Sequence, residues 1–186
     1  MNRGVLILLL VFVLASCKEI SFREPQPKGR RALSSVPRKL QGKYLTYQEN
    51  GELSKDTVVI TPYGYRFGYF DEIPASNHRE DYEEGTLSDT LVLKVYQSYY
   101  FLNLYERPEW LLRVIQQQRN GDLIYMAMEQ EEVDFNDYLK KLSSEIPIDS
   151  IKMENETLYH IDPTPSKLVE LIEKGYFTQT KLKKIP

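Results

Sequence analysis

Aromatic side chains recur at every second position of one short stretch, which runs from Tyr63 to Phe70. Because alternate residues of a strand point to the same face, one face of this stretch would carry four aromatic residues: Tyr63, Tyr65, Phe67 and Tyr69. Such a face can stack against a sugar or an apolar ligand, and it can also belong to a hydrophobic core. The core is the favoured interpretation. The four residues remain candidate ligand-binding residues, since tyrosine hydroxyls favour a face that borders water.

Acidic residues gather between Asp71 and Asp89, where we expect a long polar loop over Asp71–Ser88. Carboxylate oxygens are the ligands that Ca²⁺ prefers, and the weak candidate ligands here are Asp81, Glu83 and Glu84. Their spacing matches no calcium-binding loop, including the EF-hand pattern. A solvated acidic loop is therefore favoured, and we expect neither a metal nor a cofactor. Long loops are often functional, so a contact with a partner would be sought here first.

Nucleophilic catalysis has little support in the sequence. The two histidines, His78 and His160, lie near no Gly-x-Ser-x-Gly turn. His160 lies among apolar residues of an expected strand, where a structural histidine is favoured. A hydrolase would need His78 beside a carboxylate and a hydroxyl in one cleft. We therefore expect a protein that is not an enzyme.

The only cysteine of the chain, Cys17, follows two small residues and an apolar run from Val5 to Leu14. This run is too short to cross a bilayer, which needs about 20 residues, but it suits the core of a secretory signal peptide. Leu14-Ala15-Ser16-Cys17 resembles the lipobox of bacterial lipoproteins. The resemblance implies that residues 1–16 are removed as a signal peptide, and that acyl chains on Cys17 anchor the protein in a membrane.

The residue after that cysteine, Lys18, bears on the location of the protein. By the sorting rule of many Gram-negative lipoproteins, a lysine there implies the outer membrane. Whether the protein faces the periplasm or the cell surface stays open.

A second modification is suggested where aspartate precedes serine or threonine and an aliphatic residue follows. These tripeptides resemble the ones that some Gram-negative bacteria O-glycosylate in exported proteins. Turn chemistry at the start of a strand produces the same pattern and is the favoured explanation. The candidate glycosylated residues are Thr57, Thr90 and Ser150.

The composition indicates one domain with a tail. The chain has 24 basic and 27 acidic residues, and this mild acidic balance argues against a nucleic-acid partner. Residues 17–39 carry prolines and basic residues with few apolar groups, so we expect a lipidated N-terminus and a flexible tether there. Residues 40–186 would form a single β-rich domain.

Short apolar and β-branched runs from residue 40 onward predict strands. Asn-Gly at positions 50–51 and 120–121 predicts two β-hairpins. The connections are too short for parallel crossovers, so we expect an antiparallel meander. The expected strands are Leu40–Gln48, Thr57–Thr61, Tyr63–Phe70, Leu91–Tyr96, Tyr99–Tyr105, Trp110–Gln118, Leu123–Glu129, Ile148–Met153, Thr157–Ile161 and Tyr176–Leu182.

Two helices are expected in the second half of the chain. The first has apolar residues at helical spacing and is bounded by Asp134 as N-cap and by Pro147. The second has Thr164 as N-cap, Pro165 at its first position and Gly175 at its end.

The expected fold is mainly β with two helices. An antiparallel meander would form a barrel-like or strongly curved sheet, with a late C-terminal helix and a last short strand. This element order, together with Gly42-Lys43-Tyr44 on the first strand, resembles the lipocalin-like arrangement and its Gly-x-Trp start, although the tryptophan is replaced by Tyr44. The resemblance implies a barrel that carries a small apolar ligand.

The leading interpretation of function is a lipid-anchored cell-envelope protein whose domain contacts another envelope protein or a glycan, or has a structural role. A lipocalin-like carrier of a small apolar ligand is the alternative, and a hydrolase is a third. The carrier predicts an enclosed apolar cavity lined by inward aromatics such as Tyr65 and Phe67. The interaction protein predicts a filled core and an exposed patch.

Overall fold

The computed structural model describes residues 18–47, 51–69, 82–106, 108–130, 132–152 and 157–186. The signal peptide, Cys17, His78, Asp81 and the side chain of Tyr69 are outside the described residues, so the structure does not bear on the predictions that concern them. Within the described ranges, no helix combines the length and the apolar composition needed to cross a membrane.

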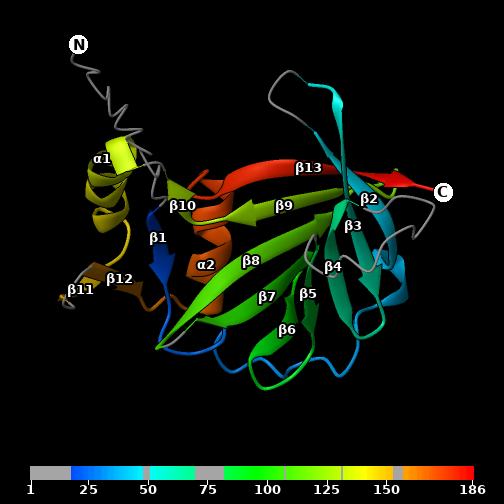
Figure 1. The fold of residues 1–186 in the computed structure, drawn as a ribbon. Coiled ribbons are helices and arrows are strands. Elements are labelled where there is room, and N and C mark those ends of the chain that lie inside the picture. The colour runs from blue at the N-terminus through cyan, green and yellow to red at the C-terminus, as the bar shows by residue number, and fades with distance from the viewer. Residues whose placement is uncertain (1–17, 48–50, 70–81, 107, 131, 153–156) are drawn as a thin grey trace, which may run out of the picture.

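The described strands build one large, strongly curved antiparallel sheet that forms a nearly closed barrel (Figure 1). The spatial order of its nine strands is β5-β4-β3-β2-β13-β9-β8-β7-β6. The last strand of the chain therefore lies between β2 and β9, and joins the two halves of the meander. The expected fold class is confirmed. The strands are β2 (Gly42–Tyr47), β3 (Leu53–Thr61), β4 (Gly64–Tyr69), β5 (Tyr82–Thr86), β6 (Leu91–Tyr96), β7 (Tyr99–Glu106), β8 (Glu109–Gln117), β9 (Leu123–Ala127) and β13 (Thr178–Ile185).

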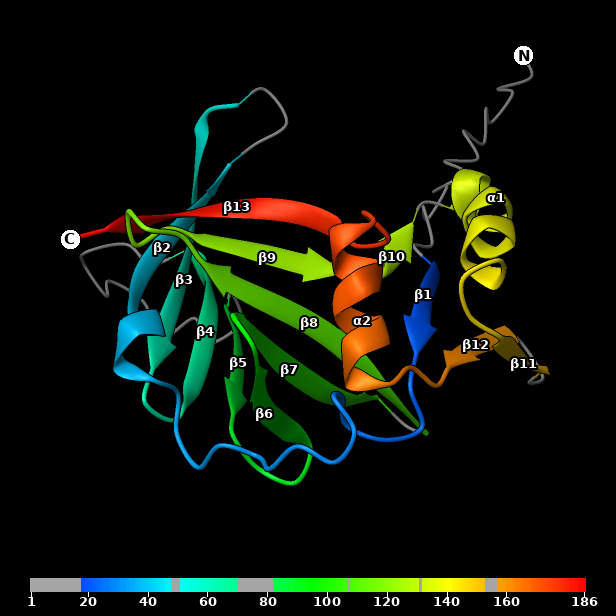
Figure 2. The same cartoon turned by 180° about the vertical axis from the view of Figure 1, so that it is seen from behind.

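A smaller sheet and two helices form a layer on one side of the barrel (Figures 1 and 2). In this sheet, of order β10-β1-β12-β11, β1 pairs antiparallel with β10 and parallel with β12. In both views α2 lies against the outer side of β8 and β9, and α1 lies farther out, beyond β1. The bounds are β1 (Lys18–Ser21), β10 (Glu129–Gln130), α1 (Glu132–Ser143), β11 (Ile148–Lys152), β12 (Thr157–Ile161) and α2 (Pro165–Glu173).

The N-terminal segment differs from the prediction of a flexible tether over residues 17–39. From Lys18 onward it is part of the fold, because β1 is a strand of the small sheet. Ile20 and Phe22 have no exposed surface, and the backbones of Phe22 and Trp110 exchange two hydrogen bonds of 2.8 and 2.9 Å. The composition suggested disorder because apolar residues are few here. The side chains of Ile20 and Phe22 are nevertheless enough to anchor the segment, because both are buried in the apolar core between the barrel and the helices.

Beyond Phe22 the chain forms what we call the strap, residues 23–40, which runs along the barrel. The buried side chain of Asn103 on β7 holds it by accepting a hydrogen bond from the Gln26 amide (2.6 Å) and donating one to the Gln26 carbonyl (2.8 Å). Lys94 on β6 donates from Nζ to the carbonyls of Pro25 (2.6 Å) and Pro27 (3.1 Å), and burial lowers the pKa of this lysine.

The end of the strap runs from β6, at one edge of the large sheet, to the turn between β3 and β4. The Leu33 amide donates to the Leu93 carbonyl on β6 (2.7 Å), and the Val36 amide donates to the Pro62 carbonyl between β3 and β4 (2.8 Å). A short 3₁₀ helix, η1 (Arg38–Leu40), then leads into β2 and buries Leu40. The strap therefore covers one end of the barrel.

Strands β7, β8 and β9 carry apolar side chains on both faces, so they separate two cores. On β8, Leu112 and Val114 point outward into what we call the outer core, which they share with α1, α2 and β1. Their neighbours Arg113 and Ile115 point to the inside of the barrel. The inner core contains residues from the strap and from several strands: Val36, Leu40, Tyr44, Ile60, Leu93, Tyr100, Leu123 and Leu182.

The signals at the ends of α2 act as the sequence predicts. Thr164 Oγ1 accepts a hydrogen bond from the Lys167 amide (3.2 Å), Pro165 begins the helix, and Gly175 follows it with a φ of +81°. Glycine adopts this left-handed conformation without a steric penalty.

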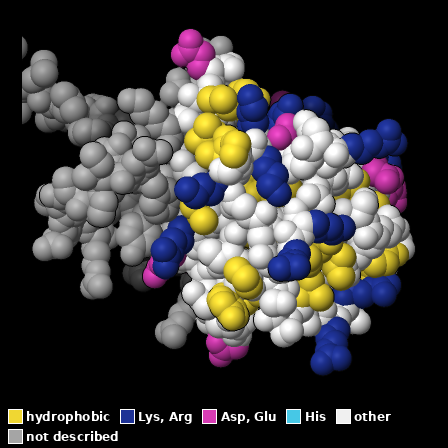
Figure 3. Space-filling model, turned by 90° about the vertical axis from the view of Figure 1, so that its right-hand side faces the viewer, with side chains coloured by type: hydrophobic (Ala, Val, Ile, Leu, Met, Phe, Trp, Pro, Cys, Tyr) yellow, Lys and Arg dark blue, Asp and Glu magenta, His cyan; other side chains and the backbone are white. Residues whose placement is uncertain are grey.

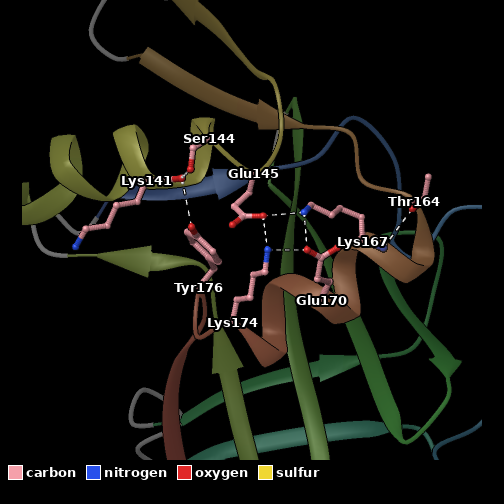
Figure 4. Close-up of polar contacts among 8 residues, drawn as sticks. All are labelled: Lys141, Ser144, Glu145, Thr164, Lys167, Glu170, Lys174 and Tyr176. Atoms are coloured by element: carbon pink, nitrogen blue, oxygen red, sulfur yellow. Dashed lines mark hydrogen bonds and ion pairs between the residues drawn. The ribbon is translucent and has the colours of Figure 1, made fainter.

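A cluster of charges ties α2 to the turn after α1 (Figure 4). Lys174 and Lys167 both donate to Glu145 Oε2, at 2.7 and 2.9 Å, and both also contact Glu170. Hydrogen bonds from Lys174 and Lys167 hold the pKa of both carboxyl groups below the usual value. Tyr176 donates to the carbonyl of Lys141 in the same region. The two helices are thus linked by polar contacts as well as by the outer core.

Other local predictions meet mixed outcomes. The hairpin of β11 and β12 is confirmed, as is the hairpin of β8 and β9, where Gly121 has a φ of +91°. The N-cap prediction for Asp134 is wrong, because α1 begins at Glu132 and includes Asp134 in its first turn. The prediction of a polar loop over Asp71–Ser88 is wrong for Tyr82–Thr86, which forms β5. The sequence did not indicate this strand because it contains Glu83, Glu84 and Gly85. An edge strand tolerates charged residues and glycine, and β5 lies at an edge of the sheet.

Positive charge gathers on the side of the barrel that lies away from β1 and α1. Figure 3 shows this side, over β2, β3 and the C-terminus, with lysine and arginine side chains around small hydrophobic areas. Strands β2 and β13 contribute exposed lysines: Lys43, Lys181, Lys183 and Lys184. The chain therefore has a local excess of positive charge on this side although its net charge is negative.

Candidate functional site

An apolar cavity of about 370 Å³ lies inside the barrel. Its volume falls within the range of small-molecule sites in proteins. Aliphatic side chains from the strap and from both halves of the sheet supply most of its wall: Val36, Leu40, Val58, Ile60, Leu87, Leu93, Leu102, Leu104, Ile115, Leu123 and Leu182.

Two of the four candidate aromatic residues line this cavity. Tyr65 and Phe67 point inward from β4, opposite Ile60 and Val58 of β3. Tyr63 does not belong to this face, because it lies in the turn before β4 and exposes 70% of its surface. Alternation along β4 therefore places two aromatic side chains in the cavity wall, and the prediction that Tyr63 shares their face is wrong.

Two glycines allow close packing of β4 and β5 around Tyr65. Gly85 pairs with Tyr65 across β4 and β5, and a Cβ atom on Gly85 would lie 2.5 Å from the tyrosine ring. On the neighbouring strand, a Cβ atom on Gly64 would lie 1.8 Å from the carbonyl oxygen of Gly85. Such distances exclude a larger residue without movement of the ring or the backbone. The close approach of β4 and β5 thus depends on glycine at both positions.

Polar groups are concentrated in one part of the cavity wall, which we call the polar corner: Tyr65, Glu83, Arg113 and Tyr125. The hydroxyl of Tyr65 donates to Glu83 Oε1 (2.8 Å), and Glu83 is exposed, so this corner reaches solvent. Burial raises the pKa of Tyr65, and the hydrogen bond to Glu83 raises it further. Burial also raises the pKa of Tyr125, so both hydroxyls stay protonated and can donate hydrogen bonds.

Arg113 is bound within the polar corner by a residue from outside the barrel. Both oxygens of Glu19, on β1, accept hydrogen bonds from its guanidinium, the Nη2–Oε2 distance being 3.0 Å. The Arg113 and Glu19 side chains are only 15% and 16% exposed. Burial acts to lower the pKa of Arg113, but the contact with Glu19, together with the nearby Tyr125 and Glu129, outweighs burial, and the arginine stays charged. Burial raises the pKa of Glu19 although Arg113 acts to lower it, and Glu129 and Glu106 add to the rise.

Another part of the wall is closed by apolar packing. Leu40 of η1 packs with Leu123 and Leu182, and the Tyr44 hydroxyl donates to the Leu40 carbonyl (2.8 Å). Tyr44 has no exposed surface. The Gly42-Lys43-Tyr44 tripeptide, singled out in the sequence, therefore lies where the strap covers the barrel.

The acidic candidates do not form a metal site in the described structure. Glu83 and Glu84 are adjacent on β5 and point to opposite faces. Glu83 lines the cavity, whereas Glu84 lies 3.4 Å from Arg66 on the outside. Among the residues that the structure describes, no three acidic, histidine or cysteine side chains gather as metal ligands would.

His160 lies on β12, in the outer layer, and does not line the cavity. It is buried, and its Nε2 atom lies 2.8 Å from Glu109 Oε2.

The glycosylation candidates occupy different settings. Thr57 is half-buried within β3, whereas Thr90 and Ser150 are exposed, before β6 and on β11 respectively.

Sequence reasoning missed Arg113, Tyr125 and Glu19 as parts of the site. A signal was present in β8, where Arg113 lies within Trp110-Leu111-Leu112-Arg113-Val114-Ile115. A strand that is apolar on both faces is covered on both, so a charge within it needs a buried partner. That partner, Glu19, lies 94 residues earlier and could not be identified from local patterns.

Fold and site together define a class: a small antiparallel barrel domain with an internal apolar cavity and one polar corner. No family model, no curated protein and no solved structure matches the chain.

Proposed function

We propose that this protein is a lipid-anchored envelope protein whose barrel binds a small apolar ligand. The observation that carries the proposal is the cavity of about 370 Å³ with its largely aliphatic wall. A cavity of this kind gains free energy by burying apolar surface, at about 25 cal/mol per Å². A domain with a purely structural role would instead fill its core to ordinary packing density.

The anchor is the second part of the proposal and is supported by the lipobox resemblance of Leu14-Ala15-Ser16-Cys17. Three acyl chains on Cys17 would hold the protein at a membrane permanently, because each buried methylene contributes about 0.8 kcal/mol. The outer membrane is proposed from Lys18. Cells grown with labelled palmitate should yield a labelled product, and Cys17→Ala should abolish the label. An unlabelled wild-type protein would contradict the anchor.

Binding in the cavity is tested by filling it. Leu102 lies in the cavity wall on β7, so Leu102→Trp should weaken the binding of decan-1-ol at least about tenfold. The measurement is isothermal titration calorimetry on the full chain in lipid nanodiscs, with the heat of empty nanodiscs subtracted. Tyr63→Trp is the matched control, because Tyr63 is exposed outside the cavity and should bind decan-1-ol like the wild type.

The result that would contradict the proposal is equally direct. If decan-1-ol gave no heat above empty nanodiscs, or if Leu102→Trp bound it as well as the wild type, the cavity would not be a binding site.

A further inference from the structure

The wall of the cavity carries a single cation among the residues that the structure describes. That cation is Arg113, and the single lining carboxylate is Glu83, which accepts its hydrogen bond from Tyr65. The rest of the wall is aliphatic or aromatic apart from Gly64, Thr46, Thr180 and the hydroxyls of Tyr65 and Tyr125. An apolar ligand in this cavity would therefore lie with one end next to a guanidinium.

The guanidinium of Arg113 already binds a carboxylate, that of Glu19. Glu19 places both carboxylate oxygens on Arg113 from β1, outside the barrel, and is not itself part of the cavity wall. Two-pronged pairing with a planar carboxylate is the geometry that arginine favours. A carboxylate that enters from the cavity side can make the same contacts in place of Glu19, because Arg113 forms part of the wall there.

The surroundings make Glu19 a partner that can be displaced. Burial raises its pKa, and two other carboxylates, Glu129 and Glu106, raise it further. A buried ion pair gains little net free energy, because desolvation offsets most of the attraction. Replacement of Glu19 by another carboxylate would preserve the charge on Arg113, and would let Glu19 move away from its acidic neighbours.

We infer that the ligand is an anionic amphiphile whose carboxylate replaces Glu19 on Arg113, while its alkyl chain fills the aliphatic part of the cavity. This inference rests on the proposed function. It adds the class of the head group, a carboxylate, and a competition between the ligand and a side chain of the N-terminal strand.

The test compares decanoate with decan-1-ol, which share a chain length and differ in the head group. Both are titrated into the full chain in lipid nanodiscs by calorimetry, with empty nanodiscs subtracted. In Glu19→Gln the amide keeps the shape of the side chain but removes the competing charge. We expect this variant to bind decanoate about tenfold more tightly, a change of about 1.4 kcal/mol, and decan-1-ol within about twofold of the wild type.

Arg113→Gln should remove the preference for decanoate over decan-1-ol. If this variant does not fold, Arg113→Lys replaces it in the experiment and should keep part of the preference. Glu84→Gln is the matched control, because Glu84 is an exposed carboxylate on the outside of β5 that contacts Arg66 and neither Arg113 nor Glu19. If Glu19→Gln changed the affinities for both probes equally, or changed neither, the inference would be overturned while the apolar site stood. If neither probe bound, the proposed function would fail as well.

Discussion

Phe22→Ala should lower the free energy of unfolding by about 3–5 kcal/mol, the range for aromatic residues removed from a core. Phe22 has no exposed surface, and it lies in the outer core with Ile20, Leu112 and Phe101. Its backbone also pairs with Trp110 on β8. Removal of the ring would leave a cavity where the N-terminal segment meets the barrel. Urea denaturation followed by circular dichroism measures the change.

The control for this experiment is Arg23→Ala, one residue later. Arg23 exposes 66% of its side chain and pairs with the exposed Asp149, so its loss should have little effect. A flexible tether would make both substitutions silent. Equal and small effects of the two variants would therefore contradict the packing of β1 and the strap against the barrel.

Asn103→Ala should lower the free energy of unfolding by about 3 kcal/mol, because it leaves buried backbone groups without partners. Asn103 has no exposed surface, and it serves both the amide and the carbonyl of Gln26. It also donates to the carbonyls of Val92 and Phe101, at 3.1 Å each. The strap loses its main polar attachment in this variant, so hydrogen exchange of the Gln26 amide should accelerate along with the loss of stability.

Asn136→Ala provides the matched control, since Asn136 is an exposed asparagine on α1. It should change neither the stability nor the exchange at Gln26. A stable Asn103→Ala variant with slow exchange at Gln26 would show that the strap does not depend on this contact.

Local signals in the sequence were enough for elements whose ends are set by nearby residues. α2 is the clearest case, because Thr164, Pro165 and Gly175 each act within one helical turn. The hairpin at Asn120-Gly121 depends in the same way on adjacent residues. Alternation along β4 also identified Tyr65 and Phe67 as residues of one face, and that face proved to line the cavity.

Features that depend on residues far apart in the chain were not predictable from one sequence. The position of β13 between β2 and β9 is set by pairing with strands about 50 and 140 residues away, as in Thr178 with Ala127 and Lys183 with Leu45. The strap packs because Asn103 and Lys94 satisfy its backbone, and neither residue reveals this role locally. Glu19, the partner of Arg113, was not predictable for the same reason, because it lies 94 residues earlier in the chain.

The start of β1 has a consequence for how a ligand would reach the barrel. Glu19 is two residues after Cys17, so if that cysteine carries the proposed acyl chains, at most about 7 Å of extended backbone separates the lipid attachment from the residue that holds Arg113. An amphiphile in the adjacent leaflet would then meet the protein without first dissolving in bulk water, a step whose cost grows by about 0.8 kcal/mol for each methylene. Exchange with the bilayer would thus depend little on how poorly the ligand dissolves, and long chains would load as readily as short ones.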